Sequence, residues 1–454
     1  MSTHMPVPPV LGWPGLLRLA LVQTALGAVV VLATSTLNRI MVVELAMPAL
    51  LPASLVALHY LVQLLRVHHG HRVDVGGRST PRIVGGMATL ASGGVLAALA
   101  TACMHAHVTA GIGLAVAAYV AIGIGVGAAG TANLALLSKR VAPQRRPLAA
   151  ALMWIMMIAG FSSSAGIAGH FLQPYSAARL VQVYALASAA ALALACLAIW
   201  RVEGSRAPVA RRAVIEGAAA RGRGGLRNAL AQVWSDPAAR RFTVFLFTAM
   251  LAFSAQELLL EPFAGLVFGY APGRSAGLAG IQNAGVLTGM LLLVMAALGR
   301  GQAAARRARH WMVAGTIGSA AGVIMLAAVA ALGRPQALPA AAFLLGLANG
   351  VFAVAALGVM MELSAAGGRG REGLRMGLWG AAQALAFAAG GLSAGAAVDV
   401  LRHLGGSAGG AYSAVFCVDG GLFLAASWCA LRLNAGVSND GLRPRLGADA
   451  GVVA

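Results

Sequence analysis

The sequence predicts an all-α integral membrane protein that crosses the bilayer many times. Of its 454 residues, 59% are hydrophobic and only 10% are charged, whereas soluble globular chains are about 25% charged. The mean hydropathy is +0.81. A soluble chain of this length would divide into domains with polar surfaces, and this chain has too few polar residues to cover them. These observations exclude a soluble enzyme or a soluble binding domain before any motif is considered.

Apolar segments of about 20 residues are long enough to cross a bilayer as helices. Twelve such segments follow one another along the chain, although the second is short and the fourth is rich in glycine. The sequence therefore predicts twelve transmembrane helices. The predicted spans are residues 17–43, 51–67, 83–103, 110–137, 148–171, 178–200, 241–263, 275–298, 311–332, 338–362, 374–398 and 410–432.

The basic residues test this count, because they divide between alternate loops. One side of the membrane holds 28 of the 33 lysine and arginine residues. Since positively charged loops stay in the cytoplasm, the basic side is cytoplasmic and both termini are expected there. This distribution also accounts for the net charge of +20 without nucleic-acid binding, because the arginines lie in short loops between apolar segments. The remaining basic residues are Arg39, Arg179, Arg274, Arg334 and Arg402.

The longest loop, residues 201–240, separates six predicted spans from six others. We expect an N-terminal six-helix half over residues 1–200, a basic cytoplasmic linker over 201–240, a C-terminal six-helix half over 241–432 and a cytoplasmic tail over 433–454. Two six-helix halves joined by a long basic loop are the layout of the major facilitator architecture. The sequence therefore predicts a major-facilitator-like fold.

Polar side chains in the first and seventh spans form the main candidate site, because polar groups in hydrocarbon need a partner or a role. Glu257 and Glu261 are four residues apart and share a helical face. Two carboxylates that close in a low dielectric do not both ionise cheaply unless a cation is near. Arg39 lies at the repeat position equivalent to Glu257, and we predict that it pairs with Glu257 or Glu261 across a central cavity. The predicted cavity cluster is Asn38, Arg39, Glu44, Gln256, Glu257 and Glu261.

Two interpretations of this cluster stay open: a helix-packing contact without chemistry, or a polar site for a headgroup, a pigment or a proton. His59 is a second candidate. Its neutral imidazole could ligate the magnesium of a chlorin, or it could be a hydrogen-bonding core residue. No phosphate-binding loop, HExxH motif or metal-binding cysteine pattern occurs in the sequence, which favours a binding protein over an enzyme. Further polar residues expected to form interhelical hydrogen bonds are Gln282, Asn283, Asn349, Glu362, Gln383 and Asp419.

The loop between the second and third spans has the form G-x-x-x-D-x-x-G-R and resembles the cytoplasmic signature loop of major facilitator proteins. Glycine permits a tight turn there, and Asp74 can pair with an arginine or cap a helix end. This loop supports the fold rather than a substrate. Its signature residues are Gly70, Asp74, Gly77 and Arg78.

Three segments resemble the PucC family, the bacteriochlorophyll-delivery branch of the major facilitator superfamily. The first runs from Thr36 to Leu45, the second, QELLLEPFAGLVFG, begins at Gln256, and the third, GLWGAAQA, begins at Gly377. The resemblance follows nearly the whole chain in order. The family-motif residues that it implies are Pro262, Phe263, Gly265, Trp379, Gly380 and Gln383.

The resemblance implies a non-enzymatic assembly factor for photosynthetic light-harvesting complexes, which binds or delivers bacteriochlorophyll to the antenna apoproteins of LH1 or LH2. The expected partners are light-harvesting antenna polypeptides, the reaction centre–LH1 complex, transiently bound bacteriochlorophyll and membrane lipids, but not nucleic acid. The expected location is the bacterial cytoplasmic or intracytoplasmic photosynthetic membrane. A rival is a proton-coupled major facilitator transporter of a small amphipathic compound, in which Glu257 and Glu261 titrate. A third alternative is a scaffold that binds only protein.

Overall fold

The computed structural model describes residues 11–65, 79–141, 146–203, 234–298, 302–366 and 372–437. Every regular element within these ranges is a helix, so the predicted all-α class is confirmed. Most of the predicted linker and tail lies outside the described residues, so their role stays a prediction. The same holds for the four signature-loop residues, Gly70, Asp74, Gly77 and Arg78.

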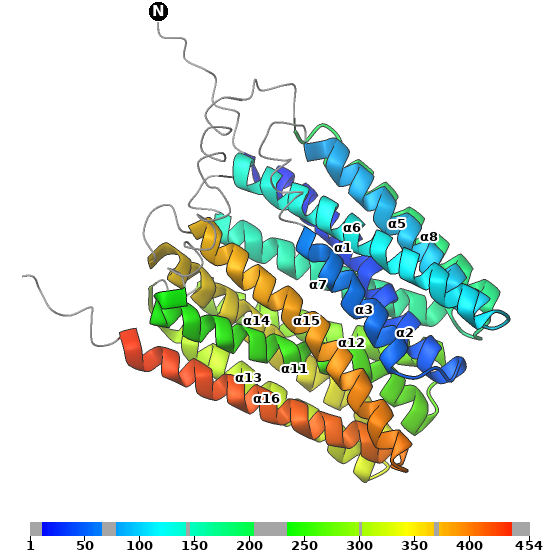
Figure 1. Ribbon diagram of the computed structural model, residues 1–454. Helices are drawn as coiled ribbons and strands as arrows, with labels where there is room; N and C mark the ends of the chain where they lie inside the picture. Colours follow the sequence, from blue (N-terminus) through cyan, green and yellow to red (C-terminus); the bar gives the residue numbers. More distant parts are fainter. Residues whose placement is uncertain are drawn as a thin grey trace, which may run out of the picture.

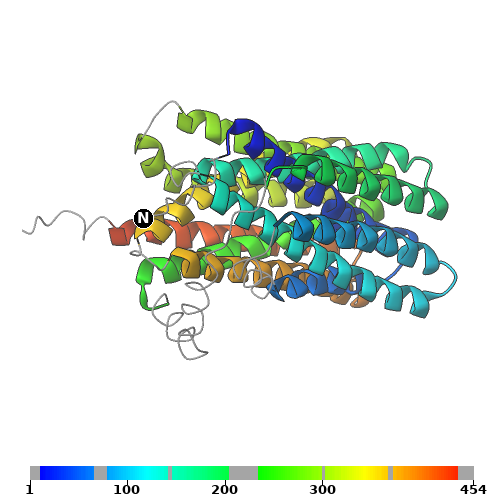
Figure 2. The same ribbon diagram turned by 90° about the horizontal axis from the view of Figure 1, so that it is seen from above.

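The long helices run side by side and form one bundle (Figure 1). Viewed from above, the helices share a common direction, and the loops gather at the two ends of the bundle (Figure 2). The elements are α1 (Trp13–Val31), η1 (Leu32–Thr36), α2 (Leu37–Arg39), η2 (Ile40–Glu44), α3 (Leu50–Val62), η3 (Gln63–Leu65), α5 (Ser79–Cys103), α6 (Val108–Arg140), α7 (Arg146–Phe171), α8 (Ala177–Ile199), α11 (Pro237–Phe268), α12 (Pro272–Leu298), α13 (Gln302–Ala331), η5 (Pro335–Ala337), α14 (Leu338–Ala366), α15 (Glu372–His403) and α16 (Ala408–Val437).

Eleven helices in the described ranges are long and apolar enough to cross a membrane, so the chain is a multi-pass membrane protein. The second predicted span corresponds to α3, an apolar helix of 13 residues that ends in the 3₁₀ turn η3. A helix of that length rises about 20 Å, whereas the hydrocarbon core is about 30 Å thick. A twelfth full-length span is therefore not found among the described residues.

The helices fall into two groups that lie against each other (Figure 1). We call α1 to α8 the N-terminal helix group and α11 to α16 the C-terminal helix group. The groups meet mainly where α7 packs on α12 and where α3 packs on α15. Gly169 of α7 faces Gly273 of α12, and a Cβ atom at Gly169 would lie 2.6 Å from the carbonyl oxygen of Gly273. The absence of side chains lets these two helices approach closely, as small residues do in membrane bundles.

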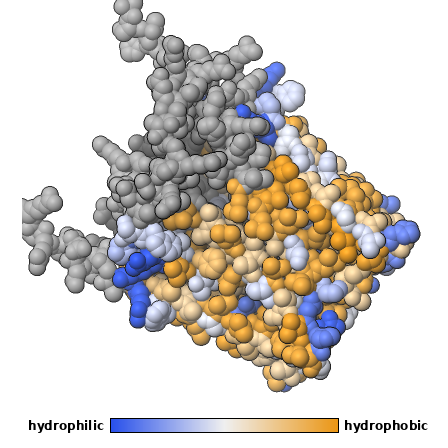
Figure 3. All heavy atoms as spheres, viewed as in Figure 1, coloured by the Kyte–Doolittle hydropathy of each residue, from blue (hydrophilic) through white to orange (hydrophobic). Residues whose placement is uncertain are grey.

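The outer surface of the bundle is apolar, as a lipid-facing surface must be. Figure 3 shows hydrophobic residues over most of the visible face, with hydrophilic residues mainly near its ends. Leu186 and Leu197 on α8 and Met295 on α12 are among the most exposed large side chains. The polar side chains of the described residues that the sequence placed within spans are mostly buried or half-buried, and those of the first and seventh spans define the candidate site. The side chain of Glu362 lies outside the described residues.

Candidate functional site

The site lies at the end of the bundle opposite Trp13, where the first membrane span ends at Glu44. We call this end of the bundle the distal end. Here the first helix continues from Trp13 to Glu44 as one span of 32 residues. Its last third contains two π-helical turns, η1 and η2, and the short α2 lies between them. π-helical turns inside α-helices occur frequently at functional sites. All of the predicted polar residues of this helix lie in this irregular part.

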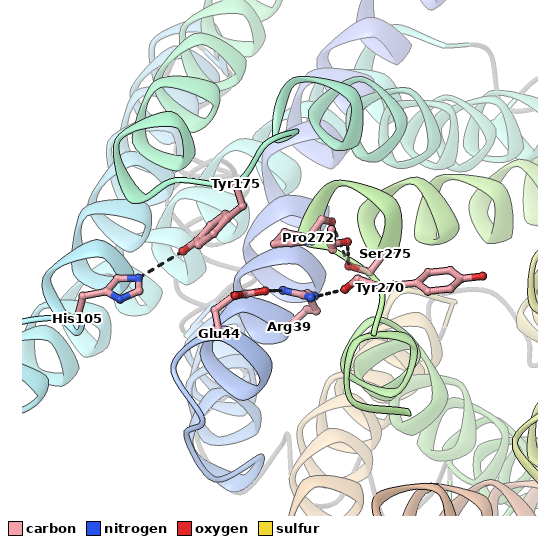
Figure 4. A network of polar contacts seen from close by, with 8 residues as sticks. Arg39, Glu44, His105, Tyr175, Tyr270, Pro272 and Ser275 are labelled. Carbon is pink, nitrogen blue, oxygen red and sulfur yellow. Dashed lines mark hydrogen bonds and ion pairs between the residues drawn. The ribbon is translucent and has the colours of Figure 1, made fainter. Parts of the chain in front are cut away.

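Arg39 is the central cation of the site and is almost completely buried. Its Nη1 atom donates to Oε1 of Glu44 at 2.5 Å, and its Nη2 atom donates to the main-chain oxygen of Tyr270 (Figure 4). The predicted pairing of Arg39 with Glu257 or Glu261 is therefore wrong. Positions 39 and 44 point to different sides of a regular α-helix, but the i→i+5 spacing of η2 brings them to one side.

Gly265 on α11 makes room for this arginine. A Cβ atom at Gly265 would lie 3.2 Å from Nε of Arg39 and 2.7 Å from Cγ2 of Val43. A larger residue would push the first helix away from α11. This gives the family-motif glycine a physical role, which is to admit a buried guanidinium between the two helix groups.

Glu261 is fully buried and fastens α11 to the first helix. Its Oε1 atom accepts hydrogen bonds from Oγ of Ser35 at 2.5 Å and from Oγ1 of Thr36 at 3.5 Å. Its Oε2 atom has no hydrogen-bond partner among the described residues. One turn away, Nδ2 of Asn38 donates to the main-chain oxygen of Leu258 at 2.5 Å. These bonds cross from one helix group to the other.

Gln256 and Glu257 are neighbours with different surroundings. Gln256 is fully buried, and its Oε1 atom accepts a hydrogen bond from Nε2 of Gln282 at 2.8 Å. Glu257 is partly buried and makes no hydrogen bond or ion pair with the residues that the structure describes. Among the described residues, Glu257 is thus the acidic group of the cluster without a polar partner.

A tyrosine that the sequence did not single out lies near the distal ion pair. The Tyr175 hydroxyl, in the loop between α7 and α8, is 3.4 Å from Nε2 of His105 (Figure 4). Burial raises the pKa of Tyr175 above its ordinary value of 10, the nearby Glu44 carboxylate raises it further, and Arg39 opposes the shift. The hydroxyl therefore stays neutral at physiological pH and extends the polar network.

Asp399 joins the two helix groups at the same end of the bundle. It lies near the end of α15, and its two carboxylate oxygens accept hydrogen bonds from the main-chain N–H groups of Ala49 at 2.8 Å and Leu50 at 2.7 Å. These N–H groups stand at the start of α3, where helices leave donors unsatisfied. Asp399 therefore caps α3 from the other group.

The sequence analysis missed several contacts at the distal end. Some of them leave a signal in the sequence and others do not. Ser35 and Thr36 could have been found, because they precede Asn38 and Arg39 in one polar run within a span. The contact at Tyr270 uses a main-chain oxygen, so no side-chain pattern indicates it.

His59 lies in α3 and is buried. Its Nε2 atom is 2.7 Å from Nε2 of Gln63, one helical turn later. The α6 helix covers the same turn, since a Cβ atom at Gly123 would lie 2.8 Å from the carbonyl oxygen of His59. A magnesium ion could reach Nε2 only by displacing Gln63, so ligation by His59 stays a prediction.

Two of the three motif residues of α15 pack against α11. Trp379 is fully buried, and its Nε1 atom donates to Oγ1 of Thr243 at 3.0 Å. Nε2 of Gln383 lies 3.7 Å from Sδ of Met250. Gly380 is exposed, with no atom near the position of a Cβ. The tryptophan and the glutamine thus fix the α11–α15 contact.

Pro262 and Phe263 lie inside α11 rather than at its end. Phe263 is fully buried and meets Phe268 and Phe416 edge-on, with Tyr412 tilted beside it. This aromatic cluster joins α11 to α16. The two residues therefore have a packing role at the level of Glu261.

The family is decided by the sequence match. Residues 36–437 match the family described as "PUCC protein". The chain belongs to this family. The PucC-family protein is also similar to the "Bacteriochlorophyll synthase 44.5 kDa chain" of Rhodobacter capsulatus, with 46% identity over 428 residues, 92% of this chain and 95% of the relative. It is 29% identical to "Protein PucC" of the same species, over 89% of this chain and 88% of the relative.

Solved structures show the fold of the PucC-family protein. A POT family transporter in complex with a thioalcohol-conjugated peptide superimposes with a TM-score of 0.67 at 14% identity, covering 93% of this chain and 96% of that one. A peptide transporter POT in complex with sulfate gives 0.65 at 13% identity, covering 94% and 96%. The protein thus has a major-facilitator-like fold and belongs to a family of purple bacteria that is involved in photosynthesis.

Proposed function

We propose that this PucC-family protein is an assembly factor for photosynthetic light-harvesting complexes, and that it binds or delivers bacteriochlorophyll to the antenna apoproteins of LH1 or LH2. The family match over residues 36–437 carries the proposal. In this proposal the chain makes twelve membrane crossings in two six-helix halves, and both termini are cytoplasmic. Its partners are antenna polypeptides and the reaction centre–LH1 complex, in the cytoplasmic or intracytoplasmic photosynthetic membrane.

The proposed mechanism is binding rather than catalysis, although the name of one relative contains the word synthase. The polar residues of the site mostly hold helices together: Arg39 holds the loop at Tyr270, and Glu261 holds Ser35. Such contacts define one closed arrangement of the distal end. Breaking them would let the two helix groups separate there, which gives a binding protein two states between which cargo is taken up and released.

Glu257 is the residue proposed to meet the cargo. It is partly accessible, and it has no partner among the described residues. A carboxyl group within a membrane bundle is favoured only where it finds a hydrogen-bonding partner or water. In this proposal a polar group of the apoprotein cargo provides that partner.

The first test is an absorption spectrum of tagged protein purified in mild detergent from a pigment-producing phototroph. We expect a near-infrared chlorin band at one pigment per protein, together with antenna polypeptide whose yield falls in Glu257→Ala. Arg334→Ala is the matched control, because Arg334 is an exposed charged residue at the distal end whose side chain makes no hydrogen bond or ion pair with the described residues. Co-purified antenna polypeptides without pigment would contradict delivery and leave a protein-only scaffold. Absence of both would favour transport.

The rival function, proton-coupled transport, is favoured by one observation. Glu261 is buried between the helix groups with Oε2 unpartnered among the described residues, which is a place where proton uptake could break contacts between the groups. Uptake or efflux of a small amphipathic compound in proteoliposomes, driven by a pH gradient and abolished in Glu261→Gln, would support it. A pigment-binding protein without such transport would contradict it.

A further inference from the structure

Asp419 is a buried acidic residue whose burial no hydrogen bond or ion pair within the described residues explains. It lies near the middle of α16, its side chain is 2% exposed, and the sequence favours an interhelical hydrogen bond for it. Its Oδ2 atom is buried without a hydrogen-bond partner, and no hydrogen bond or ion pair of Asp419 occurs within the described residues. Burial of a carboxyl group without a hydrogen-bond partner is unfavourable in an apolar medium. The cost points to a missing partner.

Asp419 lines a groove on the outside of the bundle. The groove has a volume of about 360 Å³ and lies between α11, α15 and α16. Its walls are mostly small and apolar, with Gly390, Ala394 and Ala397 on α15 and Ala414 on α16. At Gly390 the α15 backbone touches the α11 backbone, which closes the floor of the groove.

The position of the groove restricts what can enter it. Val418, on its rim, is 63% exposed on a surface that faces lipid, so the occupant arrives from the membrane rather than from water. Walls of glycine and alanine accept a flat apolar body at close range. The carboxyl group of Asp419, which lines the groove, favours a body that presents a polar atom near the middle of the membrane.

A second groove provides a comparison within the same molecule. It has a volume of about 500 Å³ and lies between α1, α7 and α8, which are the corresponding helices of the N-terminal group. Its polar lining includes Gln182 and Arg179, and it contains no carboxyl group. The requirement for a polar atom at mid-depth is therefore specific to the groove at Asp419.

We propose that the α11–α15–α16 groove binds the edge of a bacteriochlorophyll macrocycle, with the carboxyl group of Asp419 donating a hydrogen bond to a ring carbonyl. This inference rests on the proposed function and assigns the pigment a place in the protein. A chlorin is flat and largely apolar, and its edge carries carbonyl oxygens, so it matches the mostly apolar walls of the groove and the carboxyl group of Asp419. The other polar side chain of the groove, Ser393, already donates a hydrogen bond to the main-chain oxygen of Gly390. A neutral carboxyl group is both the donor that a carbonyl needs and the form that hydrocarbon tolerates.

The test is a titration of the full-length protein in nanodiscs with bacteriochlorophyll a, followed by near-infrared absorption. Wild type is expected to bind one pigment saturably. Asp419→Leu removes the donor and is expected to raise the Kd about tenfold. Asp419→Asn keeps a donor and is expected to stay within about threefold of wild type. Gln182→Leu, in the second groove, is the matched control and should bind as wild type does.

Resonance Raman spectra of the bound pigment give an independent measurement. A hydrogen-bonded carbonyl has a lowered stretching frequency, and this shift should disappear in Asp419→Leu and persist in Gln182→Leu. Size-exclusion profiles and thermal midpoints check that each variant is folded. If wild type binds no chlorin, both proposals fall. If Asp419→Leu binds as tightly as wild type with the same Raman spectrum, the proposed function stands and the groove assignment is wrong.

Discussion

Two buried carboxyl groups in the described membrane spans differ in what surrounds them. Glu261 and Asp419 are 0% and 2% exposed, and each has one oxygen without a partner among the described residues. Glu261 faces the other helix group, where Ser35 donates to its second oxygen. Asp419 faces an apolar groove and makes no such bond within the described ranges. The carboxyl group of Glu261 therefore holds the two helix groups together, whereas that of Asp419 makes no hydrogen bond that stabilises the described fold.

Arg39→Ala is expected to lower the stability of the protein most among changes at the contact between the two helix groups. It removes both bonds of a buried guanidinium, leaves a cavity beside Gly265, and leaves Glu44 without its cation. Glu44 is partly exposed, so part of this loss is screened by solvent. We expect a destabilisation of about 3 kcal/mol, measured as a lowered thermal midpoint at fixed detergent and protein concentration. Arg334→Ala is the control, and equal midpoints for the two variants would contradict the role of Arg39.

Glu261→Leu should destabilise the protein by about 1 to 2 kcal/mol, because it leaves the hydroxyl group of Ser35 and that of Thr36 without their acceptor in hydrocarbon. Glu261→Gln keeps an acceptor oxygen and should cost less than half as much. Both variants remove the carboxylate, but only glutamine keeps an acceptor, so the difference between their thermal midpoints measures the contribution of the hydrogen bonds to stability. Equal thermal midpoints for Leu and Gln would show that Ser35 and Thr36 do not depend on this residue.

Asp399→Ala tests a weaker contact between the two helix groups at the distal end, the cap of α3 by Asp399. It removes the cap on the main-chain N–H groups of Ala49 and Leu50, and loss of a capping side chain costs about 1 kcal/mol. Asp399→Asn, which keeps one acceptor oxygen, should lie between wild type and alanine. Hydrogen exchange at the start of α3 provides the local measurement. Unchanged exchange of Leu50 in the alanine variant would exclude the cap.

Much of the fold could be predicted from hydropathy, because each span must satisfy its main chain within one helix. The predicted span 178–200 matches α8, Ala177–Ile199, and the predicted span 83–103 lies within α5, Ser79–Cys103. The length of α3 could not be predicted this way. Val62 is followed by Gln63 and then by two leucines before Arg66, so composition does not show that the α-helix ends at Val62.

It was easier to predict which residues lie in the site than which of them form ion pairs or hydrogen bonds with one another. Placing polar residues within spans identified Asn38, Arg39 and Glu261, which do lie at one contact between η1, α2 and α11. The partner of Arg39 was missed because the prediction assumed a regular helix, in which Glu44 points elsewhere. Hydrophobic periodicity does not reveal a π-helical turn.

Asp419→Leu should produce the smallest change in stability and the most informative one. The same substitution that weakens the protein at Glu261 should leave it unchanged or stabilise it by up to about 1 kcal/mol here, because it removes an unsatisfied polar group and breaks no hydrogen bond in the described ranges. The measurement is the thermal midpoint without pigment. A clear loss of stability would show that Asp419 has a structural partner, and the groove would then need no ligand. A stable variant that no longer shifts its midpoint when pigment is added would mean that this carboxyl group acts in binding rather than in folding.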